Sequence, residues 1–128
     1  MSAEFDTNAD FLPSIVEEQG VKLSFQPSKR KKTKKISILI EGMFTLQNAG
    51  FVKEKISLSL HAYDFIDITL KNIEQIDLAA IQVAHLLKTN AALSNKHISL
   101  DAELSKEDRS LLFNAGLMAL LTKTKLTD

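Results

Sequence analysis

The stretch IDITLKNIEQIDLAAI, residues 66–81, joins a strand to a helix through a short connection. Ile66, Ile68 and Leu70 alternate with polar residues, which is typical of a strand that is buried on one side. The run that follows, from Leu78 to about Leu93, is mostly apolar and is long enough for a helix. Asp77 stands directly before it, where an N-cap residue is expected. These residues therefore predict a strand-helix unit in the middle of the chain.

Three further segments alternate with a period of two, at residues 21–26, 36–41 and 98–102. Pro27 ends the first of them and Gly42 follows the second. We expect the first two to form a hairpin, because they are adjacent in the sequence and no helical segment separates them. The segments at residues 66–70 and 98–102 each follow a helix, which predicts parallel pairing.

Two other helices are indicated by spacing and by capping residues. Apolar residues step by three and four after Thr45, which predicts a helix with Thr45 as its N-cap; they are Ala49, Val52, Ile56, Leu60 and Tyr63. A third helix is predicted from Ser105, with acidic residues in its first turn. Gly116 is expected to end it in a left-handed conformation.

The elements therefore follow the order β-β-α-β-α-β-α, which defines an α/β fold with a four-stranded mixed sheet. Strands that are covered on both faces read as continuous apolar runs, whereas these four alternate. We therefore expect the helices mainly on one face and a solvated face opposite. This pattern argues against a doubly wound nucleotide-binding sheet.

The residue types that carry most enzyme chemistry are absent or scattered. The chain has no cysteine, and its four glycines do not form a phosphate-binding loop. The three histidines show no metal-ligand spacing, so neither a metal nor a cofactor is expected. No apolar run approaches the roughly 20 residues of a membrane span. We expect a cytoplasmic protein that is not an enzyme.

Charge is unevenly distributed, although Lys and Arg together equal Asp and Glu at 16 each. Residues 1–20 carry acidic residues and no basic ones, and their apolar residues have no clean period. We expect them to form an N-terminal arm, either a loose flexible segment or a short helix. This arm should contribute little to the core, and the domain itself is expected at residues 21–128. A basic run at residues 29–35 is expected at the tip of the first hairpin.

Residues 66–81 resemble the centre of STAS domains, the family of sulphate transporters and anti-sigma-factor antagonists. The family has an apolar strand, a short loop, and then Asp-Ser/Thr-Ser-Gly-Leu at the start of a helix. Ile40–Thr45 is similar to the family's entry to its first helix, and Phe113–Leu117 to the Gly-Leu after its third. The resemblance covers residues 21–122 and implies a STAS-like fold in a bacterial regulatory protein.

The chain departs from the family where the regulated members are phosphorylated. Their phosphorylated serine lies two residues after the aspartate, and Ala79 occupies this position here. Leu78 stands before it and Ala80 takes the place of the glycine. Because alanine has no hydroxyl group, the resemblance implies a STAS module that is not phosphorylated at the usual position.

The resemblance also implies a protein partner, with a kinase-like anti-sigma regulator and an ABC ATPase as the family's precedents. In STAS domains the start of this helix is the usual partner surface, which predicts Asp77 as the cap and Leu78, Ala79 and Gln82 as contacts. Thr45 and Gln75, on neighbouring loops, are expected at the rim.

Two alternatives remain open. The basic run at residues 29–35 could bind nucleic acid or an anionic surface, although it lacks the interleaved aromatic residues of a stacking platform. The second predicted helix is apolar nearly all round, so neighbouring helices cover its outer face, or part of that face is a docking surface. A structural homodimer through this helix is the third reading.

Overall fold

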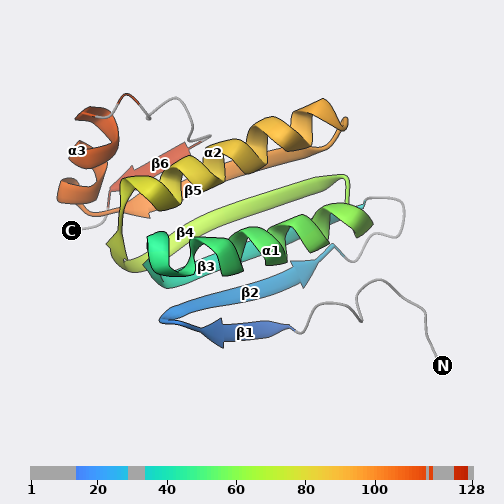
Figure 1. The fold of residues 1–128 in the computed structure, drawn as a ribbon, viewed down its shortest axis with the longest axis horizontal. Coiled ribbons are helices and arrows are strands. Elements are labelled where there is room, and N and C mark those ends of the chain that lie inside the picture. Colours follow the sequence, from blue (N-terminus) through green and yellow to red (C-terminus); the bar gives the residue numbers. More distant parts are fainter. Residues whose placement is uncertain (1–13, 29–33, 115, 117–122, 127–128) are drawn as a thin grey trace.

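The computed structural model describes residues 14–28, 34–114, 116 and 123–126. Within these ranges six strands form one mixed sheet, and they follow one another in the sheet as they do along the chain (Figure 1). The first three strands pair antiparallel, and the last four pair parallel. The strands are β1 (Ile15–Glu18), β2 (Val21–Pro27), β3 (Lys35–Phe44), β4 (Phe65–Ile76), β5 (His97–Leu104) and β6 (Lys123–Leu126).

The predicted hairpin and parallel pairs are confirmed, but the prediction of four strands is wrong. The two additional strands, β1 and β6, form the edges of the sheet and have four residues each. Their sequences, IVEE and KTKL, do not alternate between apolar and polar residues, so the sequence pattern did not separate these strands from loops.

Helix α1 (Leu46–Ala62) connects β3 to β4, α2 (Leu78–Leu93) connects β4 to β5, and α3 (Lys106–Asn114) follows β5. Figure 1 shows α1 and α2 side by side over one face of the sheet, as the alternating strands predicted. The predicted caps are also confirmed, since Thr45 and Asp77 are the N-caps of α1 and α2. Ser105 Oγ accepts a hydrogen bond from the backbone N–H of Asp108 at the start of α3. Gly116 has the expected positive φ of 73°.

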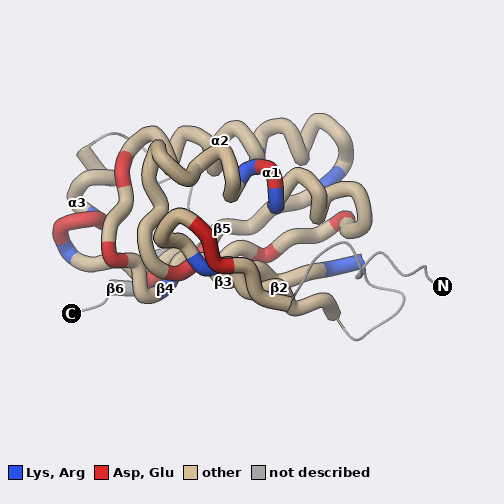
Figure 2. The backbone as a smooth tube through the Cα atoms, turned by 60° about the horizontal axis from the view of Figure 1, so that its bottom comes forward, with Lys and Arg blue, Asp and Glu red and all other residues tan. Residues whose placement is uncertain are grey.

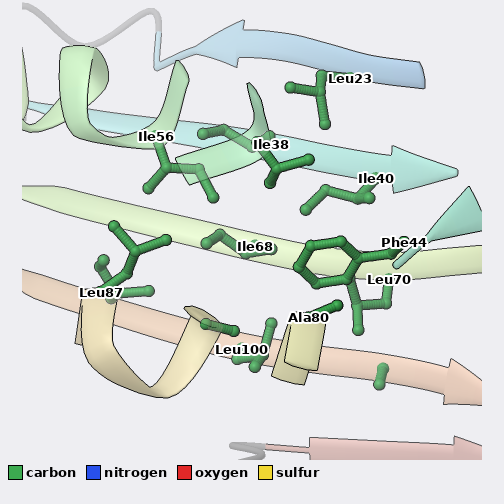
Figure 3. Packing of buried hydrophobic residues seen from close by; sticks show 14 of the residues in the cluster. Leu23, Ile38, Ile40, Phe44, Ile56, Ile68, Leu70, Ala80, Leu87 and Leu100 are labelled. Carbon is green, nitrogen blue, oxygen red and sulfur yellow. The ribbon is translucent and has the colours of Figure 1, made fainter. Parts of the chain in front are cut away.

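The core lies between this helix pair and the sheet (Figure 3). Alternate residues of β2, β3, β4 and β5 are buried against α1 and α2, and the residues between them are more exposed. Complete burial of one leucine or isoleucine side chain stabilises a fold by about 1.5–3 kcal/mol. Side chains that are almost completely buried include Leu23, Ile38, Ile40, Phe44, Ile56, Leu70, Ile81 and Leu100.

The opposite face of the sheet carries polar and charged side chains, and the strands that bear them lie below the helices in Figure 2. Lys35 Nζ lies 2.8 Å from Asp67 Oδ2, and Ser99 Oγ donates a hydrogen bond of 2.6 Å to Asp67 Oδ1. Lys35, the last residue of the predicted basic run, is therefore paired within β3–β4. Residues 29–33 of that run lie outside the described residues.

Strand β4 is longer than predicted, because it continues through residues 71–76, which were expected to form a short loop. Its register against β3 shifts between the Ile40 and Gly42 pairs and again before Met43. Asn72 has a left-handed φ of 52° at the first of these irregularities. A bulge of this kind interrupts the period of two, which explains why the alternating pattern ended at Leu70.

Part of the predicted N-terminal arm belongs to the sheet. Ile15–Glu18 pairs with β2 through a tight turn at Gln19 and Gly20, both of which have positive φ. Such a pair of left-handed residues is typical of a two-residue hairpin turn. The predicted boundary at residue 21 therefore falls inside a hairpin, and residues 1–13 lie outside the described residues.

Candidate docking surface at the helix starts

The first turns of α1 and α2 lie at the same end of the molecule. Each helix follows one of two parallel strands, and Phe44 and Ile76, the last residues of β3 and β4, are directly paired. Both helices therefore begin at the carboxyl end of the sheet and run back across it, as Figure 1 shows. The predicted partner contacts at the start of α2 are consequently joined by residues at the start of α1.

Asp77 connects the two helix starts. Its Oδ1 atom accepts a hydrogen bond of 2.9 Å from the backbone N–H of Ala80, which is the predicted cap of α2. Its Oδ2 atom accepts one of 3.0 Å from the backbone N–H of Leu46, the first residue of α1. One carboxylate thus accepts from an N–H group that has no partner within the helix in both α1 and α2. Its negative charge also interacts favourably with the positive end of each helix dipole.

Thr45 is not an accessible rim contact, contrary to the prediction. Only 6% of the residue is exposed, because it lies between the end of β3 and the first turn of α1. Its backbone N–H donates to Asn48 Oδ1 at 3.0 Å. The residue therefore helps to begin α1, and its side chain is covered by the fold.

Asn48 fixes this corner of the molecule from within. Its side chain is completely buried, and Nδ2 donates to the carbonyl oxygens of Met43 at 2.7 Å and Gln19 at 3.1 Å. Oδ1 accepts from the Thr45 N–H. Asn48 therefore joins the β1–β2 turn, the end of β3 and the start of α1. Sequence reasoning missed it, because a single asparagine near a helix start gives no indication of burial.

The remaining predicted contacts differ in accessibility. Gln75 is exposed, but it lies in β4 opposite Met43 and not in a loop as predicted. In the first turns of α2, Leu78 is 38% exposed, Gln82 is exposed and Ala79 is half-buried. Gln82 lies four residues after Leu78 and three after Ala79, so it is next to both on the surface of α2.

Leu46 extends this surface to α1 and was not among the predicted contacts. It is 69% exposed, and its backbone is bound to Asp77, the residue before Leu78. Its exposure could have been inferred from the sequence, because Leu46 is apolar and lies outside the helix face formed by Ala49, Val52, Ile56, Leu60 and Tyr63. We call Leu46, Asp77, Leu78, Ala79 and Gln82 the helix-start surface.

No helix in the described part of the chain is long and apolar enough to cross a membrane. In the same part of the chain, no cluster of three or more metal-ligating side chains is present.

The fold is STAS-like: a mixed sheet carries α1 and α2 on one face, and both begin at the carboxyl end of the parallel strands. This confirms the resemblance found in the sequence. Among solved structures, the anti-sigma factor antagonist SpoIIAA in its unphosphorylated form is similar, with 15% identity and a TM-score of 0.59. The alignment covers 78% of this chain and 87% of SpoIIAA.

A structure of the Bacillus cell fate determinant SpoIIAA in the phosphorylated form is also similar, with 15% identity and a TM-score of 0.55. In that case 78% of this chain and 90% of the other are covered. At this identity the likeness establishes the fold. No protein-family model matches the chain, and no curated protein sequence matches it significantly.

Proposed function

We propose that this chain is a non-enzymatic STAS-type interaction module of the bacterial cytoplasm that binds a partner protein through the helix-start surface. The observation that carries the proposal is the pair of exposed leucines, Leu46 and Leu78, on either side of the fixed carboxylate of Asp77. The fully buried centre of a protein interface is more apolar than the rest of the protein surface.

The backbone at this surface adds polar recognition to the apolar contact. The first turns of α1 and α2 contain no acidic residue, and Asp77 accepts from one N–H in each helix. Further N–H groups in these turns have no partner within the helix and can donate to carbonyl or carboxylate oxygens of a bound protein. The likeness to an anti-sigma factor antagonist supports a kinase-like regulator as the partner, and an ABC ATPase is the other precedent.

Ala79 makes this module independent of phosphorylation at the usual position. It lies in the first turn of α2, two residues after Asp77, and has no hydroxyl group. Binding through the helix-start surface would then be controlled by the amount or the state of the partner. The absence of an acidic residue in this turn keeps the surface apolar.

The proposal is tested by Ala79→Asp, with Ala79→Ser as the conservative control. A carboxylate in the first turn of a helix is compatible with the helix dipole, so the variant is expected to fold normally. In a docked interface the same carboxylate is desolvated without a partner, which costs several kcal/mol. Because each 1.4 kcal/mol is about tenfold in affinity, binding should fall by a factor of about 100 or more.

The measurement is capture of proteins from a lysate of the source organism on immobilised wild type and variants, with circular dichroism as a folding check. A specific partner should be retained by wild type and by Ala79→Ser, and lost by Ala79→Asp. Leu58→Asp, at an exposed leucine on α1 outside the helix-start surface, should retain it. Equal capture by folded Ala79→Asp would refute the assignment of this surface.

A further inference from the structure

A stripe of uncharged side chains runs along the outer face of α2. Leu78 is 38%, Leu86 54% and Leu93 81% exposed, and the polar residues between them are exposed as well. At 3.6 residues per turn, the members lie on one side of the helix, within about 100°. We call this set the α2 stripe; it comprises Leu78, Gln82, His85, Leu86, Thr89 and Leu93.

Charged residues are scarce in the whole of α2 as well. In the chain, 25% of residues are Asp, Glu, Lys or Arg, but α2 contains only Lys88, which is half-buried and outside the stripe. A charged partner surface would lose its hydration against this stripe and would gain no ion pair. An equally uncharged surface avoids that cost, and a second α2 stripe is such a surface.

The stripe is also symmetric about its midpoint, between His85 and Leu86. Gln82 lies three residues before His85, and Thr89 lies three residues after Leu86. Leu78 lies seven residues before His85, and Leu93 lies seven residues after Leu86. When two copies of such a helix pack antiparallel about a two-fold axis, leucine meets leucine at both ends, Gln82 meets Thr89 between them, and His85 meets Leu86 beside the axis.

We propose that the α2 stripe is a self-association surface, on which α2 of a second copy of this chain packs antiparallel. The two-fold axis passes between His85 and Leu86. Leu78 then packs against Leu93 of the partner subunit, and Gln82 lies beside Thr89 of the partner subunit. A two-fold contact of this kind closes on itself and yields a dimer without further growth.

The size of the stripe sets the strength of the dimer. Helix α2 has 16 residues and is therefore about 24 Å long. One helix face buries less than the roughly 800 Å² per partner of a standard stable interface. The dimer is accordingly weak and forms in a concentration-dependent manner. The inference does not depend on the proposed function, although Leu78 and Gln82 belong to both surfaces, so self-association would exclude a partner at the helix starts.

Two double variants test the register of the dimer. Both change the exposed positions 82 and 89, and they differ only in the sign of the charge placed at position 82. Gln82→Glu with Thr89→Lys places opposite charges across the two-fold axis, and the dimer should be retained. Gln82→Lys with Thr89→Lys places like charges across it, and the dissociation constant should rise by about tenfold or more. Sedimentation velocity over a concentration series measures both, and circular dichroism confirms that both fold.

Disulfide cross-linking through a single introduced cysteine has no background from other thiols, because the chain has no cysteine of its own. His85→Cys lies beside the proposed axis, so mild oxidation should link two copies through a disulfide. Leu58→Cys, at an exposed position of α1, should remain unlinked. Wild type that is monomeric up to about 1 mM would overturn the proposal. So would double variants that associate equally, or a His85→Cys variant that links no faster than Leu58→Cys.

Discussion

The carboxylate of Asp77 accepts a hydrogen bond of 3.0 Å from the backbone N–H of Leu46, a residue 31 positions earlier in the chain. Its other oxygen caps α2 through Ala80. A single side chain therefore links the two helix starts, which the paired ends of β3 and β4 place side by side. Any protein that docks on the helix-start surface meets two helices held in one arrangement.

Removal of this carboxylate should weaken both helix starts at once. An N-cap is worth about 0.5–2 kcal/mol, and the hydrogen bond to Leu46 adds to it. We expect Asp77→Ala to lower the free energy of unfolding by about 2 kcal/mol. Asp77→Asn retains one acceptor oxygen and should lose roughly half as much. Urea unfolding measures both; an unchanged Asp77→Ala would show that the link does not stabilise the fold.

Asn48 should be among the most sensitive polar residues of the domain. Its replacement by alanine leaves the carbonyl oxygens of Gln19 and Met43 and the N–H of Thr45 without their partner in a buried site. Unsatisfied buried groups cost about 1–3 kcal/mol each, and we expect a total loss of about 3 kcal/mol for Asn48→Ala. Asn90→Ala, at an exposed asparagine of α2, is the matched control and should change stability little.

Two glycines should respond to alanine in opposite directions. At Gly42, φ is +94° and an added Cβ atom would lie 2.5 Å from the carbonyl oxygen of Gly20, so Gly42→Ala should destabilise the fold by about 2 kcal/mol or more. Gly50 lies within α1 with no atom within 4 Å of such a Cβ, so Gly50→Ala should stabilise by about 0.5–1 kcal/mol. Thermal unfolding of the two variants measures the contrast, and a shift in the same direction for both would contradict it.

The charged face of the sheet should make stability fall in acid. Burial raises the pKa of Asp67, but hydrogen bonds from Lys35 and Ser99 outweigh it, and the pKa lies below its ordinary value of 3.8. A lowered pKa in the folded state contributes stability that is complete above the unfolded value and is lost as pH falls through the folded one.

The comparison of wild type with Asp67→Asn isolates this contribution. The difference in free energy of unfolding between them should be constant above about pH 5 and should shrink below about pH 4. Urea unfolding at several pH values measures the difference. A difference that stays constant down to about pH 2 would show that the Asp67 contacts do not favour the ionised form.

Much of the fold could be predicted from local pattern. The four alternating strands lie where the sequence placed them, and the N-caps Thr45 and Asp77 begin α1 and α2. These elements were predictable because each signal lies within one short stretch of sequence. The signals are an alternation over five residues, and a capping residue followed by an apolar run. The sheet edges were missed because Ile15–Glu18 and Lys123–Leu126 do not alternate between apolar and polar residues.

The helix-start surface was only partly predictable, because some of its contacts are distant in the sequence. The positions of Leu78 and Gln82 on the surface follow from helical spacing. The bond from Leu46 to Asp77 and the burial of Asn48 depend on how β3 and β4 end beside each other. The bulge at Asn72, which no alternating pattern reveals, helps to set those ends.

The sheet order has a consequence for how the chain folds. Each strand from β2 to β6 pairs with the strand that precedes it in the sequence, so no strand has to enter between two that are already joined. Growth from the β1–β2 hairpin toward β6 follows the direction in which the ribosome releases the chain. Pairing of sequence neighbours limits each parallel pair to a single crossover connection, so the entropy cost of loop closure is smaller than in a sheet with a permuted strand order. Each new strand and its helix can add to an existing edge while the rest of the protein is still being made.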